Sequence, residues 1–175
     1  MNIDETISRL EHIPDARTGR GPRHPEAPDL SIEDQLVQFL GSYSILRRDS
    51  GYIEFLEKYA GAMIKNLDET QIVDVLGFSD ASTGMLEMDG PLVDEDGFIL
   101  FAQCVFHIIV EGRLVDMYEY DFAFDASGER RPGVYRCSST LRSQGESYVW
   151  YADGFCSWLV ELVDNGGYYE RPALD

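Results

Sequence analysis

Carboxylates are the most abundant side chains in this sequence that could do chemistry, and four of them lie close together. Asp89, Asp94, Glu95 and Asp96 offer oxygen ligands of the kind that hard divalent cations such as Ca²⁺ and Mg²⁺ prefer. Their spacing does not fit an EF-hand loop, whose ligands alternate along the chain and end in a bidentate glutamate. We therefore expect a solvated acidic turn and no metal ligand, with a divalent-metal site as the alternative.

Cys104 and His107 are close enough in sequence to suggest a nucleophile and its base. On a strand, residues three positions apart point to opposite faces, so the thiol and the imidazole cannot meet without a bulge. Phosphate-binding glycine loops and the Gly-x-Ser-x-Gly elbow are missing from the sequence, which has 3 histidines to supply a base. We predict no catalytic residue and no cofactor.

The formal net charge of −18 is unevenly distributed along the chain. Between Asp74 and Asp125 the sequence has twelve acidic residues and a single base, Arg113. A field of that sign repels nucleic acids and anionic membranes, and it speeds the encounter with a basic protein. The alternative is that the acidity serves only to keep the protein in solution. We expect a basic protein partner, and neither nucleic acid nor membrane.

The cysteines and the N-terminus point to the cytoplasm. The 3 cysteines, Cys104, Cys137 and Cys156, are odd in number and far apart, which favours reduced thiols in the core over disulfides or a zinc site. The first residues have neither the basic start nor the apolar stretch of a signal peptide, and no apolar run is long enough for a membrane span.

The clearest alternation in the chain lies between Leu114 and Asp125, where aromatic side chains alternate with acidic ones. We expect Tyr118, Tyr120, Phe122 and Phe124 to face the core of a strand at this position. Glu119 and Asp121 then lie on an exposed sheet surface that is open to a partner rich in Lys and Arg; an ordinary solvated sheet face is the alternative. The predicted partner-binding residues are Asp89, Asp94, Glu95, Asp96, Glu119 and Asp121.

The N-terminal part of the chain is predicted to form helices. Apolar residues at helical spacing predict a short helix over 3–12, ended by Pro14, and Ser31 and Asp49 predict the N-caps of two amphipathic helices. These helices run over 32–43 and 51–59, and Ala60-Gly61-Ala62 ends the second, with a glycine in the left-handed position. The proline-rich stretch 14–28 is expected to be an extended loop, either solvated or lying against the acidic face.

Strands dominate the rest of the chain. They are predicted over 72–78, 85–88, 98–110 (one strand or two), 114–125, 134–137 and 148–151, with turns at 94–97, 111–113 and 125–128. Asp153 is the expected N-cap of a closing helix that Gly166-Gly167 stops. This order predicts an α+β fold, with a largely antiparallel sheet of about five to six strands and the N-terminal helices and the C-terminal helix packed on it. We expect one domain over 31–167, preceded by the helix and loop of 1–30 and followed by a tail over 168–175.

Several of these stretches resemble the SUKH superfamily. The resemblance spans roughly residues 35–165. It depends on Gly51-Tyr-Ile-Glu-Phe-Leu-Glu-Lys-Tyr-Ala-Gly61, on Asp96-Gly97-Phe98 entering an apolar strand, and on the Phe155-Cys-Ser-Trp158-Leu159 helix. The chain departs from the family pattern at Asp49-Ser50, where Leu-Pro is common, and at Ala60-Gly61-Ala62, which replaces Asn-Gly-Gly.

The resemblance implies an α+β domain without catalytic residues. Bacterial members of the superfamily often serve as immunity proteins, which bind and neutralise a cognate toxin, frequently a nuclease. The first functional hypothesis is therefore an acidic immunity protein for a basic toxin. The alternatives are a regulatory or scaffold module, as in eukaryotic relatives of the superfamily, and a metal-dependent enzyme that uses the carboxylates of Asp89 to Asp96.

Overall fold

The computed structural model of the protein describes residues 2–18, 31–65, 70–78, 93–138, 145, 147–167 and 169. Within these ranges the fold is α+β and the strands form one antiparallel sheet in the order of the chain, β1 to β7. The helices are α1 (Ile3–Leu10), α2 (Ile32–Ser42), the 3-10 helix η1 (Ser44–Arg48), α3 (Ser50–Tyr59) and α5 (Phe155–Asp164). The strands are β1 (Arg17–Thr18), β2 (Ala62–Lys65), β3 (Gln71–Val75), β4 (Phe98–Val110), β5 (Arg113–Asp125), β6 (Val134–Ser138) and β7 (Val149–Ala152).

The predicted fold class is confirmed, and the sheet has seven strands instead of five to six. The two described strands that the sequence did not predict, β1 and β2, pair with each other at one edge of the sheet. The two-residue β1 lies in the predicted proline-rich loop, and β2 directly follows the end of α3. Neither is long enough to show a period in the sequence. The rest of that loop and the predicted strand 85–88 lie outside the described residues.

The predicted N-caps of α2 and α3 are confirmed. The Asp34 N–H donates to the Ser31 hydroxyl at 3.1 Å, and the Tyr52 N–H donates to the Asp49 carboxylate at 3.0 Å. Helix α3 ends at Tyr59 as expected. However, the residue in the left-handed conformation is Ala60, with φ 61°, and not the glycine that follows it.

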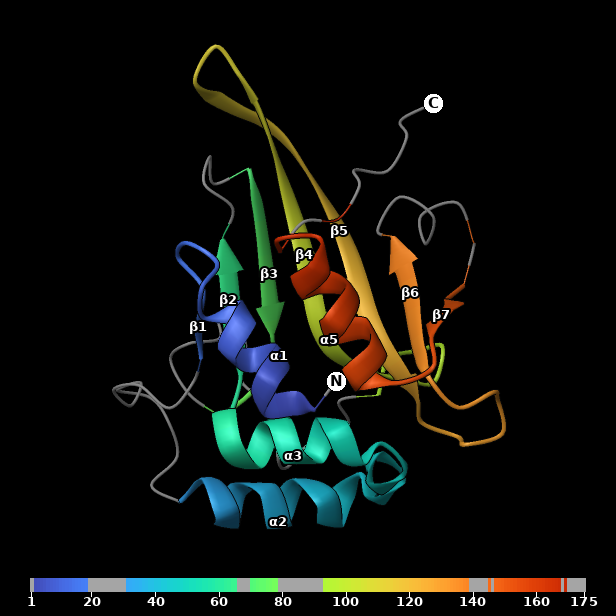
Figure 1. The fold of residues 1–175 in the computed structure, drawn as a ribbon. Helices are drawn as coiled ribbons and strands as arrows, with labels where there is room; N and C mark the ends of the chain where they lie inside the picture. The colour runs from blue at the N-terminus through green and yellow to red at the C-terminus, as the bar shows by residue number, and fades with distance from the viewer. Residues whose placement is uncertain are drawn as a thin grey trace.

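Aromatic side chains fill the main core, between one face of the sheet and the helices. In Figure 1, α1 and α5 lie over this face, and α3 lies across the end of the sheet with α2 outside it. Tyr52 of α3 packs its ring against Phe101, Phe124 and Phe155, so three parts of the chain meet at one residue. The expected inward face of β5 is confirmed: Tyr120, Phe122 and Phe124 are buried in this core, and Tyr118 packs at its margin.

The opposite face of the sheet carries a second, smaller apolar cluster. Its buried members are Phe98, Ala123, Tyr135, Cys137 and Tyr148. The Arg130 guanidinium covers the Phe98 ring, at 4.6 Å from its centroid. Because of this cluster, part of the sheet is buried on both faces. The sequence of its strands nevertheless alternates between apolar and polar residues, as is typical of a sheet with one solvated face.

The start of α5 differs from the prediction. Gly154 occupies the N-cap position, and the Asp153 side chain makes no capping bond; it pairs with Arg131 at 3.0 Å. The Phe155 N–H donates instead to the Asp49 carboxylate at 2.7 Å. The prediction that Asp153 caps this helix is therefore wrong, because an acceptor from a distant part of the chain takes its place. None of the described helices is long and apolar enough to cross a membrane.

Candidate functional site

The predicted acidic residues do not form one patch. Asp94, Glu95 and Asp96 lie in the turn before β4, and Glu119 and Asp121 lie farther along β5. Asp125, beside that turn, is six residues from Glu119, which corresponds to about 20 Å along a strand. Asp89 lies outside the described residues. The structure therefore separates the turn from the strand residues.

Asp94 is partly a structural residue. Its carboxylate accepts hydrogen bonds from the Asp96 N–H at 3.1 Å and the Phe98 N–H at 2.8 Å, which fix the tight turn into β4. Its neighbours Glu95 and Asp96 are exposed. Across all described ranges, no three His, Cys, Asp or Glu side chains are grouped as they would be around a metal ion.

Asp121 does not lie on an exposed surface, which corrects the prediction for β5. It is 7% exposed, and its carboxylate accepts a hydrogen bond from Gln103 Nε2 at 3.1 Å. Its cross-strand neighbours are Gln103 and Cys137, the latter in the second apolar cluster. The alternation assigned the two faces correctly, but it could not show that the outer face is also covered here. Glu119, two residues closer to the hairpin end, is half-buried.

A second turn, after β5, lies beside the Asp94 turn. Asp125 is buried, and its carboxylate accepts hydrogen bonds from Ser127 and from both the backbone and the guanidinium of Arg130. Burial alone would raise the pKa of this carboxyl, but the hydrogen bonds outweigh it and lower the pKa to about 2. Arg130 also reaches the Asp96 carbonyl at 3.4 Å, so it joins the two turns.

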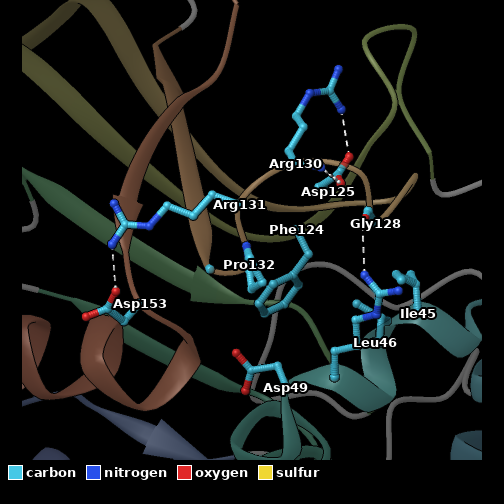
Figure 2. Close-up of a pocket in the computed structure, with 12 residues that line it drawn as sticks. Ile45, Leu46, Asp49, Phe124, Asp125, Gly128, Arg130, Arg131, Pro132 and Asp153 are labelled. Atoms are coloured by element: carbon cyan, nitrogen blue, oxygen red, sulfur yellow. Dashed lines mark hydrogen bonds and ion pairs between the residues drawn. The ribbon is translucent and has the colours of Figure 1, made fainter.

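These turns border a cavity of about 70 Å³, shown in Figure 2. Its lining consists of Ile45, Leu46, Arg48, Asp49, Phe124, Asp125, Gly128, Arg130, Arg131, Pro132, Gly133 and Asp153. The three guanidiniums at its margin already have protein partners: Asp125 for Arg130, Asp153 for Arg131, and the Gly128 carbonyl for Arg48. Asp49 accepts from the first turns of both α3 and α5. The polar groups in this cavity thus join segments of the fold.

The hairpin of β4 and β5 contains a group of residues that the sequence reasoning missed. Figure 1 shows it extending well beyond its neighbours. Among the described residues, β3 pairs with β4 only as far as Phe106, and β6 pairs with β5 only as far as Tyr120. We call residues 108–119 the arm. Exposed apolar side chains gather on it: Ile109, Val110, Leu114, Val115 and Met117. The sequence does contain a signal for this projection, which is strand length. The two predicted strands of the hairpin, 98–110 and 114–125, are much longer than the predicted strands on either side, 72–78 and 134–137.

The Cys–His pair is separated as expected. Cys104 points into the main core, where burial raises the pKa of its thiol, and His107 lies on the opposite face, across from Met117. All three cysteines are free; Cys104 and Cys137 are buried and Cys156 is half-buried.

Comparison of the chain with protein-family models, with curated proteins and with solved structures finds no match.

Proposed function

We propose that this protein is a non-enzymatic binding protein of the immunity type, which binds and neutralises a basic protein toxin in the cytoplasm. A nuclease fits the charge argument best, because a surface that binds nucleic acid is itself basic. The resemblance to the SUKH superfamily supports this class of function, and the free cysteines suit a reducing compartment.

The observation that carries the proposal is the exposed acidic charge of the molecule. The chain has a net charge of −18, and Glu95, Asp96, Glu111 and Asp116 are all exposed. They lie at the two ends of the β4–β5 hairpin, so a basic protein meets negative charge from either direction. Such a field raises association rates by roughly 10- to 1000-fold.

Co-expression tests the proposal. The gene next to this one is expressed in a bacterial host with and without this protein, and growth and co-purification are measured. We expect a basic toxin whose effect on growth is suppressed by this protein, and a complex that survives purification. A toxin that stays fully active, with no complex, would contradict the proposal. A variant with Glu95→Gln, Asp96→Asn, Glu111→Gln and Asp116→Asn should protect less well.

A further inference from the structure

Exposed apolar side chains are concentrated on one element of this fold. In the described part of the chain, seven large apolar side chains are exposed, and five of them belong to the arm. Leu114 is 56% exposed, Val115 58% and Met117 51%. The other two, Val37 and Val149, lie on α2 and β7. A cluster of this kind on an acidic protein marks a contact site for another macromolecule more often than scattered single residues do.

The strand register places several of these side chains on one face. Met117 lies opposite His107, and Leu114 lies opposite Ile109. Cross-strand partners share a face, and so do residues two apart on one strand, such as His107 and Ile109. Leu114 and Met117 are three apart on β5, but a register shift at Val115 brings them onto the same face, so these four residues form one surface. The alternate β4 residues Cys104 and Phe106 are in the main core, so this surface faces away from α1 and α5.

Burial falls steadily towards the end of the hairpin. On β5, residues 120–125 are buried, Tyr118 and Glu119 are half-buried, and all residues from Arg113 to Met117 are exposed. A two-stranded ribbon has no third strand to complete its faces, and it is only marginally stable unless a further surface packs on it. The apolar side chains of the arm thus contribute little to the core and remain available for a partner.

We propose that the apolar face of the arm, formed by Ile109, Leu114 and Met117, docks into an apolar pocket of the basic partner. Lysine and arginine side chains at the edge of that pocket then contact Glu111 and Asp116. This inference rests on the proposed function and names the surface that carries it out. The paired apolar and charged contacts are those of a typical protein interface, with a desolvated centre and a polar rim.

Charge decides which occupant fits the arm. The arm has three acidic residues, Glu111, Asp116 and Glu119, and one basic residue, Arg113. A second copy of this chain would bring a molecule of net charge −18 against one of the same charge, whereas a basic protein gains from the same contacts. We therefore assign the arm to a basic partner and not to self-association.

The test compares two double variants by their affinity for the purified toxin encoded by the neighbouring gene. The arm variant carries Leu114→Ser and Met117→Ser. The control variant carries Val37→Ser and Val149→Ser, which remove exposed apolar side chains on other elements. Because all four residues are exposed, both variants should keep the wild-type melting temperature within a few degrees. We expect the arm variant to lose at least about tenfold in affinity, and the control variant to bind as the wild type does.

Hydrogen exchange of the wild-type complex gives a second readout that needs no variant. Amides of residues 108–117 should exchange more slowly in the complex than in the free protein. Unchanged affinity of a folded arm variant, or unchanged exchange in this segment, overturns the inference while the proposed function stands. A wild-type dimer that the arm variant converts into a monomer also overturns it. If the wild-type protein binds no basic neighbour at all, the proposed function itself has failed.

Discussion

At the scale of single residues, Asp49 connects more of the molecule than an ordinary helix cap does. One carboxylate oxygen accepts from the Tyr52 N–H at the start of α3, and the other accepts from the Phe155 N–H at the start of α5. Without Asp49, α5 has no side-chain cap, since its own N-cap residue is Gly154. One carboxylate thereby orients two helices, one of which starts 106 positions after Asp49 in the chain.

Replacing Asp49 should therefore cost more than losing an ordinary cap. We expect Asp49→Ala to lower the free energy of unfolding by about 2 kcal/mol, twice the usual value of about 1 kcal/mol for one cap. Ser31→Ala, which removes the single cap of α2, is the matched control. Urea titration measures both changes, and Asp49→Asn, with one carbonyl oxygen left, should fall between them. Equal losses for Asp49→Ala and Ser31→Ala would contradict the double-cap assignment.

The carboxylate of Asp125 should make stability depend on pH in the acid range. Its folded-state pKa of about 2 lies below the value of about 3.9 for an unfolded chain. The stabilisation is thus fully present above about pH 4 and is lost as the pH falls through about 2, and it amounts to the order of 1–2 kcal/mol.

Unfolding free energies at about pH 5 and about pH 2.5 test this assignment, because most of the expected loss of stability falls between these two pH values. Asp125→Asn should show a smaller loss of stability between the two than the wild-type protein. Asp153→Asn, which removes the 77%-exposed partner of Arg131, should show nearly the wild-type loss. If both variants lose as much as the wild type on acidification, Asp125 is not the group responsible.

At the scale of elements, the sequence predicted what local patterns determine. Ser31 and Asp49 gave the starts of α2 and α3, and the alternation after Leu114 gave the inward face of β5. Contacts between distant segments were not accessible in this way. Examples are the capping of α5 by Asp49 and the burial of Asp121 next to Cys137 of the second apolar cluster. The arm was missed for a related reason: its projection depends on where β3 and β6 end, and not on the hairpin itself.

A close approach between the end of α3 and the end of β3 gives a prediction at this scale. A Cβ added to Gly77 would lie 1.5 Å from the Ala60 carbonyl oxygen, which is backbone and cannot move aside. The same carbonyl accepts from the Phe78 N–H at 2.6 Å. Only glycine fits where these two segments meet.

Gly77→Ala should lower the free energy of unfolding by at least about 1–3 kcal/mol, the usual range for overpacking. The matched control is Gly41→Ala on α2, where an added Cβ meets nothing within 4 Å. Because alanine favours the helix, that change should stabilise the protein by about 0.5–1 kcal/mol. Thermal unfolding measures both, and a Gly77→Ala protein as stable as the wild type would show that the two segments are not held this closely.

At the scale of the whole molecule, charge and shape act over different distances. In the proposed complex, the −18 charge would attract the basic protein from far away, whereas the arm would contact it only after encounter. The exposed acids Glu95 and Asp96 lie just before β4, whose twelve residue steps place the end of the arm at least about 40 Å from them along the strand. The two ends of the hairpin should therefore respond differently to salt.

The most direct test of the central claim is the association rate constant with the purified neighbouring toxin, measured as ionic strength rises. Between 0.01 M and 0.15 M salt the Debye length falls from about 30 Å to about 8 Å, so long-range attraction is largely screened. We predict that association slows by at least about tenfold over this interval, while dissociation changes much less.

Two charge-neutralising variants complete this measurement. The arm variant carries Glu111→Gln and Asp116→Asn, and the turn variant carries Glu95→Gln and Asp96→Asn. At low salt, both variants should slow association. At about 0.15 M salt the arm variant should still bind more weakly, and the turn variant should match the wild type, because charges beyond a Debye length are screened. An association rate that does not change with salt, or equal effects of both variants at the higher salt, would contradict recognition of a basic partner through the arm.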